Sequence, residues 1–359
     1  MTDCILNGEM NTITSSILED DRKYIVYLPE GYEMSEERYS VLVVVNANYN
    51  PYFAHAASVT QLLSGTRIPP MIVVGIHTPD HAIDFFHVPH PRIQNSGKAE
   101  YFLRFITDEL LPLIEKTYRT NTFRVLYGQS NGGMFTVYSL LKNPDSFNAY
   151  IAGSPMLGWG SEFFMEKGKE MFNSDSSLKR FLYMEYGEND YDRVVTTVPD
   201  FAAIIEKNTP HDFVWKWRTL KGEAHAPISV LYNGLSLIFP RWQMTTEEGM
   251  KEGLEGVERF YANLSQKYGI EIKLPSEVLS DIGVNWIMKE QPEMGRPFLE
   301  RMVELYPHHE GGYYLLGIVE ERMENFSKAV EFYRRSLEIN PDYPPPRDKI
   351  ANLESEGRI

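Results

Sequence analysis

Cysteine is nearly absent from this chain. Cys4 is the only one, so no internal disulfide can form and no cysteine-rich metal site exists. Long apolar runs are also missing: residues 41–45 form a typical short one, far below the roughly 18 residues that span a bilayer. The first residues show no basic region followed by an apolar core. We therefore expect a cytoplasmic protein, or a periplasmic one if a leader has been removed.

Positive charge is scarce as well. Thirty-five Lys and Arg residues stand against 50 Asp and Glu residues, which gives a net charge of −15. This balance argues against nucleic acid or an anionic membrane as the main partner. Hydrophobic residues make up 43% and charged residues 24%, a globular composition, and 359 residues are enough for two domains.

The first two-thirds of the chain alternates short β-branched runs with helical patterns. Strands are predicted at residues 23–28, 41–45, 71–76, 122–127, 150–152, 181–186 and 213–219. Helices are predicted at residues 98–118, with a kink at Pro112, and at residues 134–142 and 228–239. This alternation predicts an α/β fold, a mostly parallel central sheet with helices on both faces.

After about residue 244 the strand signals end and a 34-residue repeat appears. Gly283 and Gly317 are one such interval apart, and so are Pro307 and Pro341. The pattern resembles the tetratricopeptide repeat, with small residues where two helices approach and a proline that ends the second helix. The predicted domains are an α/β domain at residues 1–243, a connecting helix or linker at 244–275, and a small all-α repeat domain with a capping helix at 276–359.

Two repeat units are few for a long peptide groove, since stacking normally needs about three. Packing on the first domain, formation of a homodimer and binding of a protein partner therefore all remain open for the predicted repeat domain.

The sequence GQSNGG at residues 128–133 stands between a predicted strand and a predicted helix. A nucleophile elbow requires this context, because the serine occupies a strained turn and a Cβ at the flanking positions would collide with its neighbours. Ser130 is therefore the candidate nucleophile. The amide of Asn131 is then expected at a helix N-terminus, where it can bind an oxyanion. The alternative is an ordinary glycine-rich turn.

An alcohol needs an adjacent base to act as a nucleophile at neutral pH. The base is expected late in the chain, in a loop after the last predicted strand and before the last helix of the α/β domain. His225 occupies such a loop. The alternative is a histidine on a surface loop.

The third member of a catalytic triad is expected between these two, in the loop after another strand. Residues 187–192 supply several carboxylates there. Asp190 is our choice because Gly187 permits the turn before it, while Glu188 and Asp192 remain possible. The resulting order of serine, acid and histidine is the order of α/β-hydrolases.

Further residues are predicted around this constellation. The loop after the strand at residues 41–45 should supply the second oxyanion donor, which we assign to the amide of Asn48. Tyr49, Asp84, Phe85 and Trp159 are candidate pocket residues, with ordinary core packing as the alternative.

One loop is rich in histidine. The spacing matches no standard zinc pattern, so neither a metal nor a cofactor is expected. The residues concerned are His77, His81, His87 and His90.

Five stretches together resemble the Putative esterase family, which includes S-formylglutathione hydrolase, feruloyl esterases, mycolyl transferases and siderophore esterases. They are residues 27–32, 105–115, 128–133, 151–155 and 223–225, and the likeness covers roughly residues 12–240. The resemblance implies an α/β-hydrolase fold with Ser130 as nucleophile and His225 as base. It also implies that some members carry a tetratricopeptide tail.

The predicted function is hydrolysis of a small-molecule carboxylic ester through an acyl-enzyme, with siderophore-type or small acyl esters as substrates. One alternative is a tetratricopeptide-type scaffold with a vestigial hydrolase domain. Another is an acyltransferase or thioesterase that uses the same triad, because all these reactions share a tetrahedral intermediate.

Overall fold

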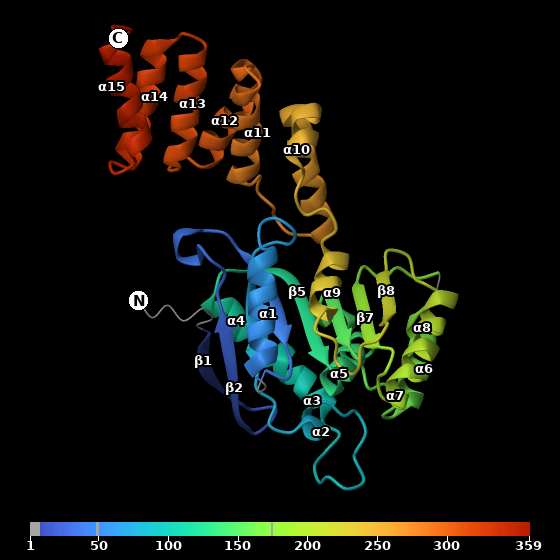
Figure 1. Cartoon of the computed structure of the whole chain (residues 1–359). Coiled ribbons are helices and arrows are strands. Elements are labelled where there is room, and N and C mark those ends of the chain that lie inside the picture. The colour runs from blue at the N-terminus through green and yellow to red at the C-terminus, as the bar shows by residue number, and fades with distance from the viewer. Residues whose placement is uncertain (1–7, 48–49, 174) are drawn as a thin grey trace. The chain divides into compact units, whose positions relative to one another are not determined.

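The computed structural model describes residues 8–47, 50–173 and 175–359. The chain forms two compact units that divide between Trp242 and Gln243, and each is described by itself. Figure 1 shows a central sheet with surrounding helices in the first unit and helices alone in the second.

Among the described residues, the first unit holds one eight-stranded sheet in the order β1-β2-β4-β3-β5-β6-β7-β8. The strands are β1 (Glu9–Ser15), β2 (Asp20–Tyr27), β3 (Tyr39–Val44), β4 (Met71–Ile76), β5 (Thr120–Gln129), β6 (Ala149–Gly153), β7 (Phe181–Gly187) and β8 (Val214–Leu220). β2 runs antiparallel to β1 and β4, and the remaining neighbours are parallel. The predicted mostly parallel sheet is confirmed.

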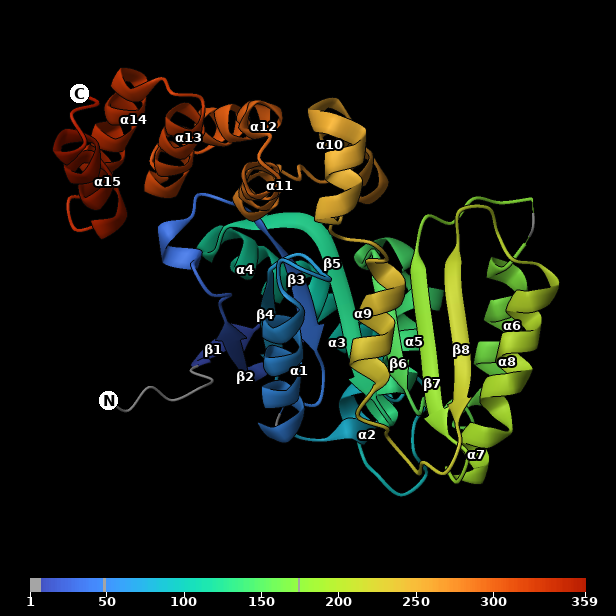
Figure 2. The same ribbon diagram turned by 45° about the horizontal axis from the view of Figure 1, so that its top comes forward.

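Helices cover both faces of this sheet. α1 and α9 contact one face, and α5 packs on the other beside α6 and α8 (Figure 2). The helices of the unit are α1 (Asn50–Leu63), α2 (His81–Asp84), α3 (Ala99–Arg104), α4 (Leu111–Thr117), α5 (Asn131–Lys142), α6 (Ser161–Met171), α7 (Asp192–Val195), α8 (Thr197–Lys207) and α9 (Val230–Ile238). All six residues of β3 and of β4 are buried, which explains why both sequences are apolar apart from Ser40 in β3.

The single helix predicted over residues 98–118 is instead interrupted. α3 passes into a π-helical segment, Phe105–Leu110, before α4 begins. The amide of Leu111 donates to the carbonyl of Ile106, one residue further back than in an α-helix. Pro112 then lies in the first turn of α4, where its missing N–H leaves no hydrogen bond unmade.

This topology brings the C-terminal ends of β5, β6, β7 and β8 to one edge of the sheet. Ligand sites of open α/β sheets lie at that edge, because the loops that follow the strands converge there. The loops that carry the predicted serine, acid and histidine follow β5, β7 and β8.

The second unit is helical throughout its described elements. They are α10 (Thr246–Tyr268), α11 (Ser276–Met288), α12 (Pro292–Leu305), α13 (Glu310–Arg322), α14 (Phe326–Ile339) and α15 (Pro344–Ser355). α11 packs on α12 and α13 on α14. A Cβ built on Gly317 would lie 2.3 Å from the ring of Tyr333, so the close approach of α13 and α14 requires this glycine. Gly253, at φ 71°, interrupts α10.

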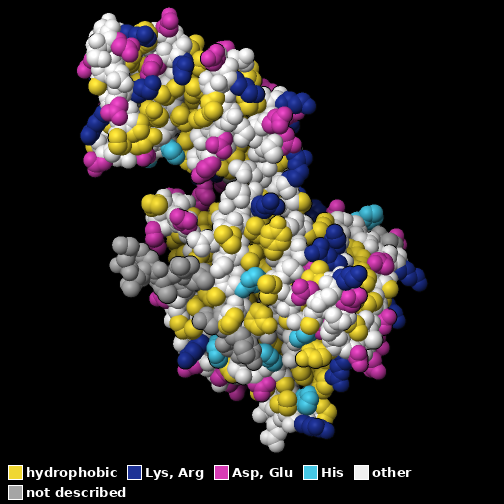
Figure 3. All heavy atoms as spheres, in the orientation of Figure 1, with side chains coloured by type: hydrophobic (Ala, Val, Ile, Leu, Met, Phe, Trp, Pro, Cys, Tyr) yellow, Lys and Arg dark blue, Asp and Glu magenta, His cyan; other side chains and the backbone are white. Residues whose placement is uncertain are grey.

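On the face drawn in Figure 3, acidic and basic side chains are mixed over the second unit, with hydrophobic side chains between them. No helix among the described residues combines the length and the apolar character needed to cross a bilayer.

Candidate active site

Ser130 occupies the turn between β5 and α5 with φ 59° and ψ −119°, a conformation that is strained for a residue with a side chain. Two glycines make room for this turn. A Cβ on Gly128 would lie 2.3 Å from the carbonyl oxygen of Gly132, and a Cβ on Gly132 would lie 1.9 Å from Oδ1 of Asn46. The amide of Ser130 donates to the carbonyl of Gly153 at 2.8 Å, which ties the turn to the end of β6.

His225 lies in the loop between β8 and α9 and contacts the serine directly. Its Nε2 is 2.8 Å from Oγ of Ser130, and its Nδ1 is 2.6 Å from Oδ1 of Asp190. An ionised carboxylate only accepts hydrogen bonds, so the neutral imidazole carries its proton on Nδ1 and leaves Nε2 to accept the serine proton. The arrangement is the geometry of a serine–histidine–acid triad.

Asp190 is held as an ionised acceptor. Its side chain has no exposed surface. Burial alone would raise the pKa of this carboxyl, but hydrogen bonds from His225, from the Ser154 hydroxyl and from the Tyr191 amide hold the pKa below its usual range. Glu188 instead accepts from the amide of Gly222.

Four successive residues after His225 are each held by a side chain from another part of the unit. The bonds run from Ala226 N to Ser154 Oγ (2.8 Å), from Gln129 Nε2 to the Pro227 carbonyl (3.1 Å), from His55 Nε2 to the Ile228 carbonyl (2.9 Å), and from Ser229 Oγ to Glu185 Oε1 (2.6 Å). Each of the four residues that follow His225 is therefore held in place by a hydrogen bond.

Glu185 on β7, which accepts from Ser229, is a fully buried carboxylate. Its Oε2 accepts from Nε of Arg218 at 2.7 Å, from Nδ2 of Asn233 at 2.8 Å and from the hydroxyl of Tyr183. With Ser229 on the other oxygen, the carboxylate joins β7, β8 and the start of α9. Its partners satisfy its charge inside the fold.

Replacement of Glu185 by alanine is expected to lower the free energy of unfolding by about 3 kcal/mol, because it leaves the buried hydroxyl of Tyr183 and the partly buried amide of Asn233 without an acceptor. Urea denaturation followed by tryptophan fluorescence measures the loss. Glu166→Ala, at an exposed position on α6, is the control and should change stability by less than about 0.5 kcal/mol. Equal stabilities for the two variants would contradict the anchoring role.

The oxyanion donors are only partly described. α5 begins at Asn131, so the amide of this residue is among the N-terminal amides that no intrahelical carbonyl accepts. In the loop after β3, the amides of Val45 and Ala47 are engaged by the carbonyls of Tyr127 and Ile76. Asn48 and Tyr49 lie outside the described residues.

The family model described as Putative esterase matches residues 15–226, more than half of the chain. The chain belongs to this family. A tetratricopeptide-repeat model matches residues 312–343 in the second unit. These matches confirm both resemblances seen in the sequence.

Two curated relatives of this chain are esterases by name. Ferri-bacillibactin esterase BesA of Bacillus subtilis is 44% identical over 72 residues, which cover 20% of this chain and 25% of that protein. Siderophore enterobactin esterase of Emericella nidulans is 28% identical over 106 residues, 28% of this chain and 35% of that protein. The matched segments thus span only a quarter to a third of these relatives.

Among solved structures, an IroE-like serine hydrolase from Shewanella oneidensis superposes with a TM-score of 0.70 at 25% identity. The superposition covers 84% of this chain and 100% of that chain. This match and the observed topology confirm the predicted α/β-hydrolase fold.

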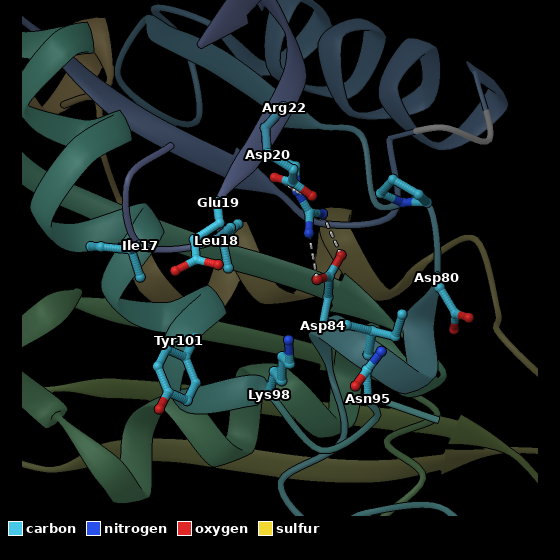
Figure 4. Close-up of a pocket in the computed structure, with 12 residues that line it drawn as sticks. Ile17, Leu18, Glu19, Asp20, Arg22, Asp80, Asp84, Asn95, Lys98 and Tyr101 are labelled. Atoms are coloured by element: carbon cyan, nitrogen blue, oxygen red, sulfur yellow. Dashed lines mark hydrogen bonds and ion pairs between the residues drawn. The ribbon is translucent and has the colours of Figure 1, made fainter. Parts of the chain in front are cut away.

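Asp84 does not line the site around Ser130. Its carboxylate is buried in a two-pronged ion pair with Arg22 of β2, at 2.5 and 2.9 Å (Figure 4). The pair borders a separate cavity of about 440 Å³ between the β1–β2 turn, α2 and α3, and neither Ser130 nor His225 lines it. The prediction that Asp84 is a pocket residue at the triad was wrong, because a guanidinium from a distant strand pairs with the carboxylate.

Phe85 is also misassigned. Its side chain is fully buried against Phe102 and Phe135, so it is a core residue, the alternative considered for it. Trp159 is only partly buried, in the loop after β6, where it stacks on His90 and lies under the guanidinium of Arg193. That loop also joins the elbow, since the amide of Met156 donates to the Ser130 carbonyl.

The histidines of the 77–90 loop are dispersed among aromatic rings. His81 stacks on Phe85, and His87 packs against Tyr138 and Phe163. Burial lowers the pKa of both histidines. Within the described ranges, no three His, Cys, Asp or Glu side chains are grouped as a metal would require.

Two residues at the site escaped sequence reasoning. Tyr191, 60% exposed, places its ring centroid 4.6 Å from that of His225. Ser154 bonds to both the acid and the histidine loop. Ser154 follows β6 and Tyr191 follows β7, and both strands end at the edge of the sheet where the triad lies. Knowledge of the strand order would therefore have identified both residues.

Proposed function

We propose that the esterase cleaves a carboxylic ester through an acyl-enzyme on Ser130. The serine Oγ attacks the carbonyl carbon while Nε2 of His225 takes the hydroxyl proton, and the same nitrogen then protonates the leaving alcohol. A water molecule then attacks the acyl carbonyl carbon while Nε2 of His225 takes one of its protons. The bond to Ser130 Oγ breaks, His225 returns the proton to Oγ, and the carboxylic acid is released. Asp190 keeps the imidazole in the required tautomer. The observation that carries the proposal is the continuous chain from Ser130 Oγ through His225 to Asp190, at 2.8 and 2.6 Å.

The oxyanion of the tetrahedral intermediate is assigned to two backbone amides. Asn131 supplies one from the start of α5, where the helix dipole also favours negative charge. Asn48 remains our proposed second donor; in the same loop, the amides of Val45 and Ala47 already have carbonyl partners.

The proposed substrates are siderophore-type esters, followed by small acyl esters. The names of the two curated relatives support this class. The exposed ring of Tyr191 beside His225 supports it independently, because it offers an aromatic surface to a flat acyl or alcohol group at the reacting bond. Trp159, in the loop after β6, and Arg193, in α7 directly after Tyr191, offer a further aromatic and cationic pair.

A substrate panel tests the proposal. Nitrophenyl esters of increasing acyl length, matched thioesters and amides, and bacillibactin and enterobactin with and without iron are incubated with the full chain, and products are separated by chromatography. We expect ester cleavage, fastest for the siderophores, with amides left intact. Faster thioester cleavage, or acyl transfer to an added alcohol in place of hydrolysis, would favour the alternative reaction classes. Cleavage of none of these compounds would overturn the proposal.

The repeat unit is proposed as an interaction module for a second copy of the chain or for another protein. The tetratricopeptide match supports this class of role. The cytoplasmic location remains a prediction.

A further inference from the structure

Ser154 is the first residue after β6 and has no exposed surface. Its hydroxyl donates to Oδ2 of Asp190 at 2.5 Å and accepts from the amide of Ala226 at 2.8 Å. Its own amide donates to the carbonyl of Glu185 at 2.8 Å. One buried hydroxyl therefore joins the ends of three neighbouring strands, since Asp190 follows β7 and Ala226 follows β8.

The two oxygens of Asp190 have different partners. Oδ1 accepts from Nδ1 of His225 and from the amide of Tyr191, whereas Oδ2 accepts from the Ser154 hydroxyl. Rotation of the carboxylate about its Cβ–Cγ bond would break all three bonds at once. Ser154 thus helps to hold the Asp190 carboxylate in the orientation in which Oδ1 faces the imidazole of His225.

The bond to Ala226 acts on the other side of the imidazole. Ala226 follows His225 directly and has a φ of 59°, a left-handed conformation that an alanine adopts only when its surroundings require it. The Ser154 hydroxyl accepts the amide of this residue and so holds the backbone that carries the histidine.

We propose that Ser154 is a positioning residue of the esterase, which acts on the reaction through Asp190 and His225 without touching the substrate. This inference deepens the proposed function and rests on it. Removal of the hydroxyl leaves a buried carboxylate oxygen of Asp190 and the amide of the partly buried Ala226 without their partner. The imidazole is then no longer held in the orientation that faces Ser130. Contacts that orient the ligands of a metal typically change activity by about 10- to 100-fold when they are removed, and we expect a loss of similar size here.

Two substitutions separate positioning from stability. Ser154 has a φ of 42°, which glycine tolerates better than alanine. Ser154→Gly should therefore melt at or above the temperature of Ser154→Ala, although both lack the hydroxyl. We expect both variants to lose about 10- to 100-fold in kcat on the best ester of the panel, with KM changed less than threefold. Ser139→Ala is the control, because Ser139 is equally buried but donates to a helix carbonyl in α5.

Activity that follows melting temperature, with the glycine variant near wild type, would overturn the positioning role. A second measurement uses Asp190→Asn as background. Because part of the effect of Ser154 passes through Asp190, Ser154→Ala should lower kcat by a smaller factor in the Asp190→Asn background than in wild type, and a full multiplicative loss would contradict the proposal. Failure of the proposed function itself is distinguishable, because Ser130→Ala would then leave turnover unchanged.

Discussion

Replacement of Ser130 by alanine is expected to reduce ester turnover by at least about 10⁴-fold, because no other group can form the acyl-enzyme. The hydroxyl is the only atom removed, and the backbone of the turn is fixed by Gly128, Gly132 and the bond to Gly153. Substrate binding should therefore persist while chemistry is lost, so the effect falls on kcat. Whatever turnover remains would come from the oxyanion site and from binding alone.

A fluorophosphonate probe checks the same prediction without a known substrate. Wild type should gain one probe mass on the peptide that contains Ser130, and Ser130→Ala should gain none. Ser236→Ala is the matched control, since Ser236 is an exposed serine on α9 whose hydroxyl only donates to the carbonyl of Tyr232. Labelling of Ser130→Ala at wild-type rate would assign the nucleophile elsewhere and remove the basis of the proposed mechanism.

The elbow could be predicted because three signals coincide in a short stretch. A β-branched run, a glycine-flanked serine and a helical pattern follow one another, and each is local in sequence. β1 gave no comparable signal, because Glu9–Ser15 is an edge strand that mixes polar and apolar residues. The helices α1, α6 and α8 were also not predicted.

Contacts that depend on strand order lay beyond sequence reasoning. Ser154 meets Asp190 because β6 and β7 are neighbours, and it meets Ala226 because β8 pairs with β7. No local pattern indicates that pairing. The prediction for Asp84 was wrong for the same reason, since its partner Arg22 is 62 residues away on β2. A buried ion pair and a pocket carboxylate look alike in sequence.

The replacement of Asp190 by asparagine is expected to lower kcat by about 10³- to 10⁴-fold with little change in fold. Asparagine keeps the shape of the carboxylate and can still accept from Ser154 or Tyr191. Its amide group, however, can donate to Nδ1 of His225, which favours the tautomer with a proton on Nε2. That nitrogen then cannot take the proton of Ser130. Glu188→Gln and Asp192→Asn, which alter the other carboxylates considered for this role, serve as controls and should stay within about threefold of wild type.

The pH dependence of stability separates Asp190 from a residue that merely fills space. Because its pKa is lowered in the folded state, ionised Asp190 contributes stability above the usual carboxyl pKa near 4, and this contribution is lost as pH falls through the folded value. Asparagine does not titrate. Wild type should therefore melt above Asp190→Asn at pH 7, and the gap should narrow as pH decreases below about 4. A difference in melting temperature that stays constant across this range would mean that ionised Asp190 is not stabilised by its bonds to His225 and Ser154. Another carboxylate would then have to be the acid of the triad.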